Sequence, residues 1–208
     1  MGKDEASRRR AAEKRKKREL EMRKKKTEFR RASSGEKEEP QKPVRIADLP
    51  LVESVISKGF EERGLAHILL ARRHADGTLA VGGFYVDTLC LGIKDSALIP
   101  RIEEKDYREN VRPSIFNDPV ELIDCPPELA RAVAEGAAEF ADRYGFRPNK
   151  RWDDARKIFQ GIGASENAPV FGREGKPCFV KRGESNAAAI IAKLARKAGE
   201  GNYTIEEG

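Results

Sequence analysis

The chain has 208 residues, of which 37% are charged and 38% hydrophobic, a length that suits one ordinary domain with a tail rather than two full domains. Its charge is divided unevenly: residues 1–45 contain 18 Lys and Arg against 9 Asp and Glu, whereas residues 46–208 contain 23 against 26. No run of about 18 apolar residues occurs, so the sequence predicts no membrane span, and the basic start lacks the apolar core of a secretory signal. We therefore expect a basic arm and linker over residues 1–45, followed by one globular domain over residues 46–208.

Three cysteines, Cys90, Cys125 and Cys178, form no Cys-x-x-Cys pair and are odd in number. This pattern favours free thiols in a reducing compartment, and hence a cytoplasmic protein. With only two histidines and no close Cys/His spacing, we expect neither a zinc site nor another metal or cofactor.

The basic arm has the composition of a solvated helix. Residues 5–31 are rich in Ala, Glu, Lys and Arg and contain neither Pro nor Gly, and they are followed by a polar linker. Only Leu20, Met22 and Phe29 are large and apolar, which is too little to offset the entropy of ordering by packing. We expect this segment, by itself, to be helical or disordered.

Such a density of cations suits contact with a phosphate backbone, whose binding releases counterions. The basic clusters carry no aromatic residue for base stacking, so the predicted binding is independent of base sequence, with RNA or a ribosomal surface as the partner. Alternatives with the same chemistry are a solubilising tail, a nuclear-import signal and a patch for anionic membranes, the last weakened by the lack of an apolar stripe. The predicted nucleic-acid-binding residues are Arg8, Arg9, Arg10, Lys14, Arg15, Lys16, Lys17, Arg18, Arg23, Lys24, Lys25, Lys26, Arg30 and Arg31.

The first half of the domain contains the strongest strand signal. Residues 47–64 fit a short helix that begins at Asp48 and ends at Gly64. Residues 65–73 and 79–93 fit two strands, joined by a turn that contains Asp-Gly. Both strands are apolar on both faces, which predicts a central hairpin covered from both sides, with a bulge or a close contact at its Gly-Gly pair.

The second half is mainly helical by pattern. Residues 94–125 suggest loops with short helical pieces, residues 126–146 an amphipathic helix, and residues 152–162 a shorter one. Residues 168–183 fit a hairpin and residues 184–199 a helix, after which the chain suits a terminal edge strand. This order predicts an α+β fold: a small, mostly antiparallel sheet built from two hairpins and packed with three to four helices.

Three segments, "ARRHADGTLAVGGFYVDTLCLGIKD", "GAAEFADRYGFRP" and "FGREGKPCFVK", together resemble an uncharacterised family of bacterial proteins. The resemblance covers roughly residues 62–205, the scale of one domain, and the basic arm lies outside it. No activity is known for that family, so the resemblance implies no functional residues.

The densest polar cluster in an apolar stretch is formed by Asp87, Lys94 and Asp95, close to Cys90. The two carboxylates suggest a divalent-metal site for phosphodiester hydrolysis, with the lysine stabilising developing charge. The spacing departs from the restriction-type nuclease pattern, and we favour structural roles in a strand end and a turn.

Two further ideas concern neighbouring residues. Cys90 with His67 or His74 would form a nucleophile pair, although a thiol between two leucines favours a buried, inert group. Basic residues of the body would extend the footprint of the arm if the two predicted hairpins lie side by side, and these are Arg72, Arg73, Lys181 and Arg182.

We conclude from the sequence that a non-enzymatic protein associated with RNA or the ribosome is the favoured interpretation. A divalent-metal nuclease or hydrolase using Asp87 and Asp95 is the first alternative. A protein-interaction module with a solubilising tail is the second.

Overall fold

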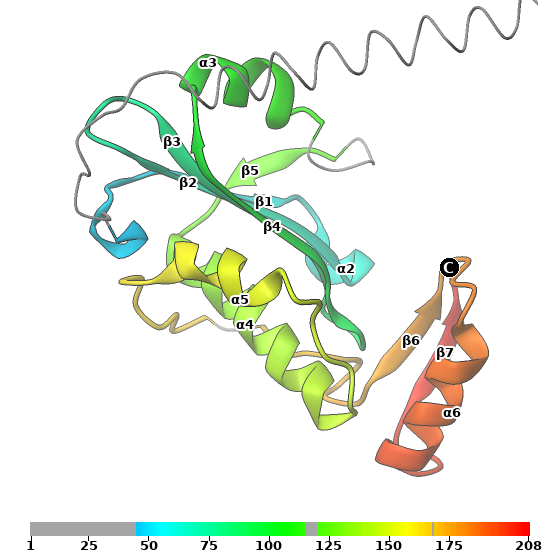
Figure 1. Cartoon of the computed structure of the whole chain (residues 1–208). Helices are drawn as coiled ribbons and strands as arrows, with labels where there is room; N and C mark the ends of the chain where they lie inside the picture. The colour runs from blue at the N-terminus through cyan, green and yellow to red at the C-terminus, as the bar shows by residue number, and fades with distance from the viewer. Residues whose placement is uncertain (1–44, 115–119, 168) are drawn as a thin grey trace, which may run out of the picture. The chain divides into compact units, whose positions relative to one another are not determined.

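A five-stranded antiparallel sheet in the order β4-β3-β2-β1-β5 forms the centre of the fold (Figure 1). The computed structural model describes residues 45–114, 120–167 and 169–208, all of which belong to one compact unit, residues 44–208. The sheet and the helices around it confirm the predicted α+β class. The strands are β1 (Leu51–Ser57), β2 (Leu65–Arg73), β3 (Leu79–Asp87), β4 (Gly92–Ile102) and β5 (Leu122–Asp124).

The central hairpin of β2 and β3 agrees with the prediction. Its register runs without a slip from Leu65 opposite Asp87 to Arg73 opposite Leu79, so its Gly-Gly pair makes no bulge. The expected close contact does occur, because a Cβ on Gly82 would stand 2.7 Å from the side chain of Ile158. Nearly every residue of both strands is buried, as expected for strands covered on both faces.

Three strands of the main sheet were not predicted. The helix predicted over residues 47–64 is wrong, because residues 51–57 form β1 between β2 and β5, and helix remains only in η1 (Ile46–Asp48) and α2 (Phe60–Arg63). The strand predicted over residues 79–93 ends earlier, at Asp87, and the loops predicted over residues 94–125 contain most of β4, an edge strand that pairs with β3, and all of β5. In each case the partner strand supplies hydrogen bonds that local propensity does not encode.

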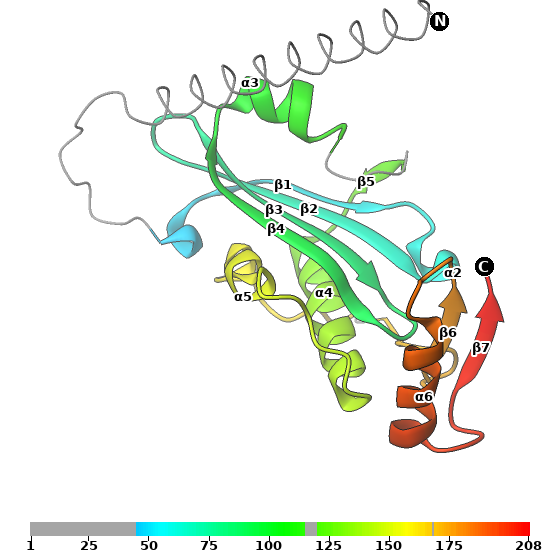
Figure 2. The same ribbon diagram turned by 45° about the vertical axis from the view of Figure 1, so that its right-hand side comes forward.

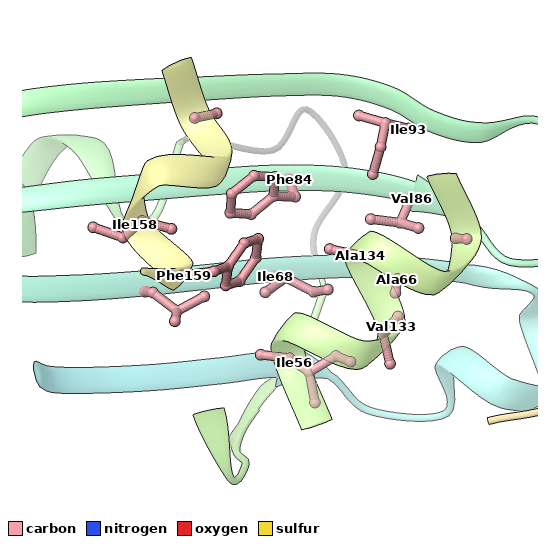
Figure 3. Close-up of a cluster of buried hydrophobic side chains, with 14 of the residues drawn as sticks. Ile56, Ala66, Ile68, Phe84, Val86, Ile93, Val133, Ala134, Ile158 and Phe159 are labelled. Carbon is pink, nitrogen blue, oxygen red and sulfur yellow. The ribbon is translucent and has the colours of Figure 1, made fainter. Parts of the chain in front are cut away.

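Helices α4 (Pro127–Arg143) and α5 (Trp152–Ala155), with η3 (Arg156–Phe159), cover one face of the sheet (Figures 1 and 2). Figure 3 shows apolar side chains of the sheet and of these helices pointing toward one another. Phe84 of β3 stacks on Phe159 with ring centroids 4.7 Å apart. The predicted helices over residues 126–146 and 152–162 are thus confirmed, the second as a shorter and tighter element.

The opposite face is covered near the β2–β3 turn by α3 (Glu104–Asp106) and a turn of π-helix, η2 (Tyr107–Val111). Tyr107 is fully buried against this face, and its hydroxyl donates a hydrogen bond of 2.6 Å to Glu53 of β1.

The C-terminal elements are β6 (Cys178–Lys181), α6 (Ala187–Ala198) and β7 (Thr204–Glu207). The helix and the terminal strand were predicted, but the hairpin over residues 168–183 is wrong, because β6 pairs with β7 in parallel and α6 forms the crossover between them. This βαβ unit joins the end of the main sheet, where the Cys178 N–H donates to the Leu89 carbonyl oxygen at 3.0 Å.

None of the helices in the described part of the chain is both long enough and apolar enough to cross a bilayer.

Candidate functional site

The predicted nucleic-acid-binding residues Arg8 to Arg31 precede Arg45, the first residue that the structure describes. They lie outside the described residues and remain a prediction. The candidate residues of the body can be placed, and each has a definite set of contacts.

Asp87 closes the turn between β3 and β4. Its side chain is 2% exposed, and Oδ1 accepts hydrogen bonds of 2.9 Å from the backbone N–H groups of Leu89 and Cys90. Burial raises the pKa of this carboxyl group, while the two hydrogen bonds and the charges of Lys94 and Arg182 act in the opposite direction. This is the structural role at a strand end that the sequence favoured.

Lys94 and Asp95 each bind a different part of the chain. Lys94 Nζ donates to Glu184 Oε1 at 3.0 Å, an ion pair that ties β4 to the segment before α6. Asp95 Oδ1 accepts from Arg151 Nη2 at 2.6 Å and from Asn149 Nδ2 at 3.1 Å, which holds the segment before α5.

The carboxylates of Asp87 and Asp95 are therefore directed at different parts of the chain. Within residues 45–114, 120–167 and 169–208, no group of three or more His, Cys, Asp or Glu residues is placed to hold a metal ion. The residues present do not fit the metal-hydrolase interpretation.

The thiol of Cys90 has no exposure to solvent and packs with Phe179 and Leu194. Burial raises its pKa far above the ordinary value, so the thiolate needed for nucleophilic attack is disfavoured. Of the proposed bases, His67 stacks on Tyr85 with centroids 4.7 Å apart, and His74 Nε2 lies 2.9 Å from the carbonyl oxygen of Pro100. The predicted burial of the Cys90 thiol is confirmed.

Arg72 is the clearest correction to the predicted basic footprint. Its side chain is directed into the protein and is 4% exposed. The guanidinium donates to the carbonyl oxygens of Leu49 and Gln160 at 2.7 Å and of Ile158 at 3.0 Å, which holds η1 and η3 against the sheet. Desolvation lowers the pKa of Arg72. A fourth hydrogen bond, of 3.3 Å to the Ala47 carbonyl oxygen, completes the set of acceptors that offsets the cost of burying this group. It is a structural residue and presents no charge to a ligand.

The other three basic residues of that predicted footprint also bind partners within the protein. Arg73 pairs with Glu104 at 2.6 Å, Lys181 pairs with Glu207 at 2.6 Å, and Arg182 Nη2 donates to the Arg63 carbonyl oxygen at 2.8 Å. The predicted hairpins do not form a shared basic surface, because the second one is replaced by the parallel βαβ unit.

Ion pairing of this kind is common over the described surface. Lys58 with Glu121 and Arg112 with Glu53 join distant segments, while Arg147 with Asp142 and Lys157 with Asp154 pair within a few residues of each other. Each of these pairs places a carboxylate beside a cation and so reduces the attraction that the cation exerts on an external anion.

The outer face of α4 also contains ion pairs, and it has more acidic than basic residues. Residues of α4 line a cavity of about 360 Å³ together with Gly163, Ala164, Ser165 and Phe171, and the ring of Phe171 rests on Gly136. Arg131 on its wall is paired with Glu135 at 2.7 Å. The charged residues of α4 are Glu128, Arg131, Glu135, Glu139, Asp142 and Arg143.

Helix α6 differs. It has no acidic residue, and its charged residues are Lys193, Arg196 and Lys197. None of the three forms an ion pair with another described residue of the chain. These three cations were not among the predicted binding residues, because the apolar stripe of residues 184–199 indicates only a helix with one buried face. The signal was present as a run of 15 residues, from Ser185 to Gly199, that contains no carboxylate.

Comparison with known proteins gives no match: no family model, no curated protein and no solved structure is similar to this chain. The resemblance to a bacterial family stays a prediction.

Proposed function

We propose that this protein binds the phosphate backbone of RNA, free or in a ribosome, through its basic arm, without catalysing a reaction. The observation that carries the proposal is the segregation of charge along the chain. Residues 1–45 have an excess of nine cations, 18 against 9, while residues 46–208 have an excess of three acids, 23 against 26.

The ion pairs of the described surface support the proposal that the arm, and not the domain, attracts the RNA. Many cations of the body are neutralised by neighbouring carboxylates, and Arg72 is buried, so much of the body offers little attraction to a polyanion. The same pairs occupy carboxylates that would otherwise be available to neutralise the arm. A long cationic segment with an internally paired domain behind it suits backbone contact by the arm, with the domain providing a rigid body.

The test is the salt dependence of RNA affinity, measured with the full chain and a short single-stranded RNA of mixed sequence. Each phosphate contact contributes about 0.7 to the slope of log affinity against log salt for single strands. Replacing Lys24, Lys25 and Lys26 by Gln should therefore lower that slope by about 2.

The matched control replaces three lysines that are already ion-paired, Lys58, Lys157 and Lys181, by Gln. It removes the same number of charges of the same type and should leave the slope nearly unchanged. Equal effects of the two triple variants, or an affinity that does not depend on salt, would contradict the proposal.

A further inference from the structure

Helix α6 turns a face to solvent that contains cations and small side chains but no carboxylate. Ala188, Ala189, Ala192, Arg196 and Lys197 are exposed along it, and Lys193 is half-buried at its edge. Because alanine is short and uncharged, a polymer can approach the helix closely without displacing a side chain or meeting a like charge.

The opposite side of α6 fixes the orientation of this face. Ile190 and Leu194 are buried against Cys90 and Phe179, and the helix is the crossover between two paired strands (Figure 2). The cations are therefore presented from a packed element in one direction.

The side chains of Lys193 and Lys197 are also ordered by contacts of their own. Lys193 Nζ donates to the Gly145 carbonyl oxygen at 3.2 Å and lies 5.0 Å from the centre of the Phe146 ring. The stems of Lys193 and Lys197 both pass over Gly145, at 3.7 and 3.8 Å from the position of a Cβ there. An ammonium group has three donors, so Lys193 retains two for a ligand after bonding the carbonyl. Ordering these stems before binding reduces the entropy lost when an anion is bound.

The charge of this cluster is not cancelled locally. Within the described residues, Lys193, Arg196 and Lys197 have no ion-pair partner, whereas Lys157 and Lys181 lie 2.6 Å from carboxylates. The negative end of the helix dipole lies near these cations and favours their position, but it carries only about half a unit of charge, against three full charges.

We infer that the solvent face of α6, with Lys193, Arg196 and Lys197, is a second phosphate-contact surface that binds the sugar–phosphate backbone of RNA. The inference rests on the proposed function and adds a site on the folded domain to the site on the arm. Lys193 and Lys197 are one helical turn apart, a spacing of about 6 Å along the axis, which allows each to contact a different phosphate. The outer face of α4, with four acids and two bases, is the region of the domain that the RNA avoids.

The experiment measures RNA affinity of the full chain between about 50 and 200 mM salt for two lysine pairs. The double variant K193Q/K197Q should weaken binding about tenfold at the lower salt and reduce the slope by about 1.4, which is two contacts of about 0.7 each. The control K157Q/K181Q removes two paired lysines and should do neither. If both double variants have the same affinity and slope, the inference is overturned.

A second variant covers the case in which loss of the Lys193 hydrogen bond disturbs the fold. Ala192→Glu leaves all three cations and the buried side intact, and glutamate is a good helix former. It should weaken RNA binding severalfold by placing a carboxylate on the proposed surface, and wild-type affinity in this variant would overturn the inference.

Failure of the inference and failure of the proposed function give different results. If the Lys24–Lys26 replacements weaken RNA binding and K193Q/K197Q does not, the arm is a binding site and α6 is not. If K193Q/K197Q weakens binding and the Lys24–Lys26 replacements do not, α6 is a binding site and the arm is not. Binding to phosphatidylserine vesicles that is lost in K193Q/K197Q, while RNA affinity is kept, would assign the surface to a lipid headgroup and overturn the RNA assignment.

Discussion

Helices α4 and α6 are both amphipathic, but they differ in how much they bury and in what they present to solvent. Helix α4 buries seven residues against the main sheet, and its outer face mixes acids with bases, several of them paired. Helix α6 buries only Ile190 and Leu194, and its outer face has three cations and no acid. Helix α4 packs extensively on the sheet and has a net negative outer face, whereas α6 buries less and has a net positive one.

The largest expected effect concerns how firmly α6 is held. Leu194 has no exposure to solvent, so Leu194→Ala should lower the free energy of unfolding by about 3 kcal/mol through lost burial and a residual cavity. Urea unfolding of the full chain measures this change. Ile205 on β7, which is 39% exposed, is the matched control, and its replacement by Ala should cost less than about 1 kcal/mol. Equal effects of the two replacements would show that α6 is not anchored by its buried face.

The next effect concerns the ion pair between β4 and the segment before α6. Burial acts to raise the pKa of Glu184, but hydrogen bonds from the Arg182 N–H and from Lys94 outweigh it, so the pKa lies below its ordinary value. A carboxyl group with a lowered pKa stabilises the folded state above its unfolded pKa, and this contribution is lost as the pH falls through the folded pKa. Glu184→Gln should therefore cost about 1 kcal/mol at pH 7, with the pair partly exposed to water, and the difference from wild type should shrink as the pH is lowered below the ordinary pKa of a glutamate. A difference that stays constant as the pH is lowered through this range would contradict the assignment.

The smallest effect is expected on α4. Glu128 and Glu139 line the outer cavity of this helix and form no ion pair with the described residues. If RNA avoids this face, the double variant E128K/E139K should change RNA affinity by less than about twofold at about 0.15 M salt, where charges more than about 8 Å apart are largely screened. A tenfold gain in affinity would show that RNA passes over α4 and would contradict the proposed difference between the two helices.

The elements that could be predicted are those whose own residues specify them. The Asp-Gly turn between two apolar runs predicted β2 and β3, and the spacing of Val133, Ala137 and Phe140 predicted α4. The prediction for residues 51–57 failed because their apolar residues fit the spacing of a helix as well as that of a strand. These residues are Leu51, Val52, Val55 and Ile56. Only the pairing of Val55 with Leu69 and of Ile56 with Ile68 resolves the ambiguity, and both partners are distant in sequence.

The proposed binding surfaces also depend partly on composition and partly on tertiary contacts. The excess of cations in residues 1–45 and the absence of acids in α6 are properties of composition, which no packing can alter. The cationic arm, the nearly neutral charge of residues 46–208, the central hairpin and the amphipathic helices can therefore all be predicted from the sequence. It took the folded structure to show that Arg72 bonds buried carbonyl oxygens, whereas Lys193 and Lys197 have no carboxylate partner among the described residues. The physical reason is that the fate of a cation depends on which carboxylates and carbonyl groups surround it, and those groups come from segments far away along the chain.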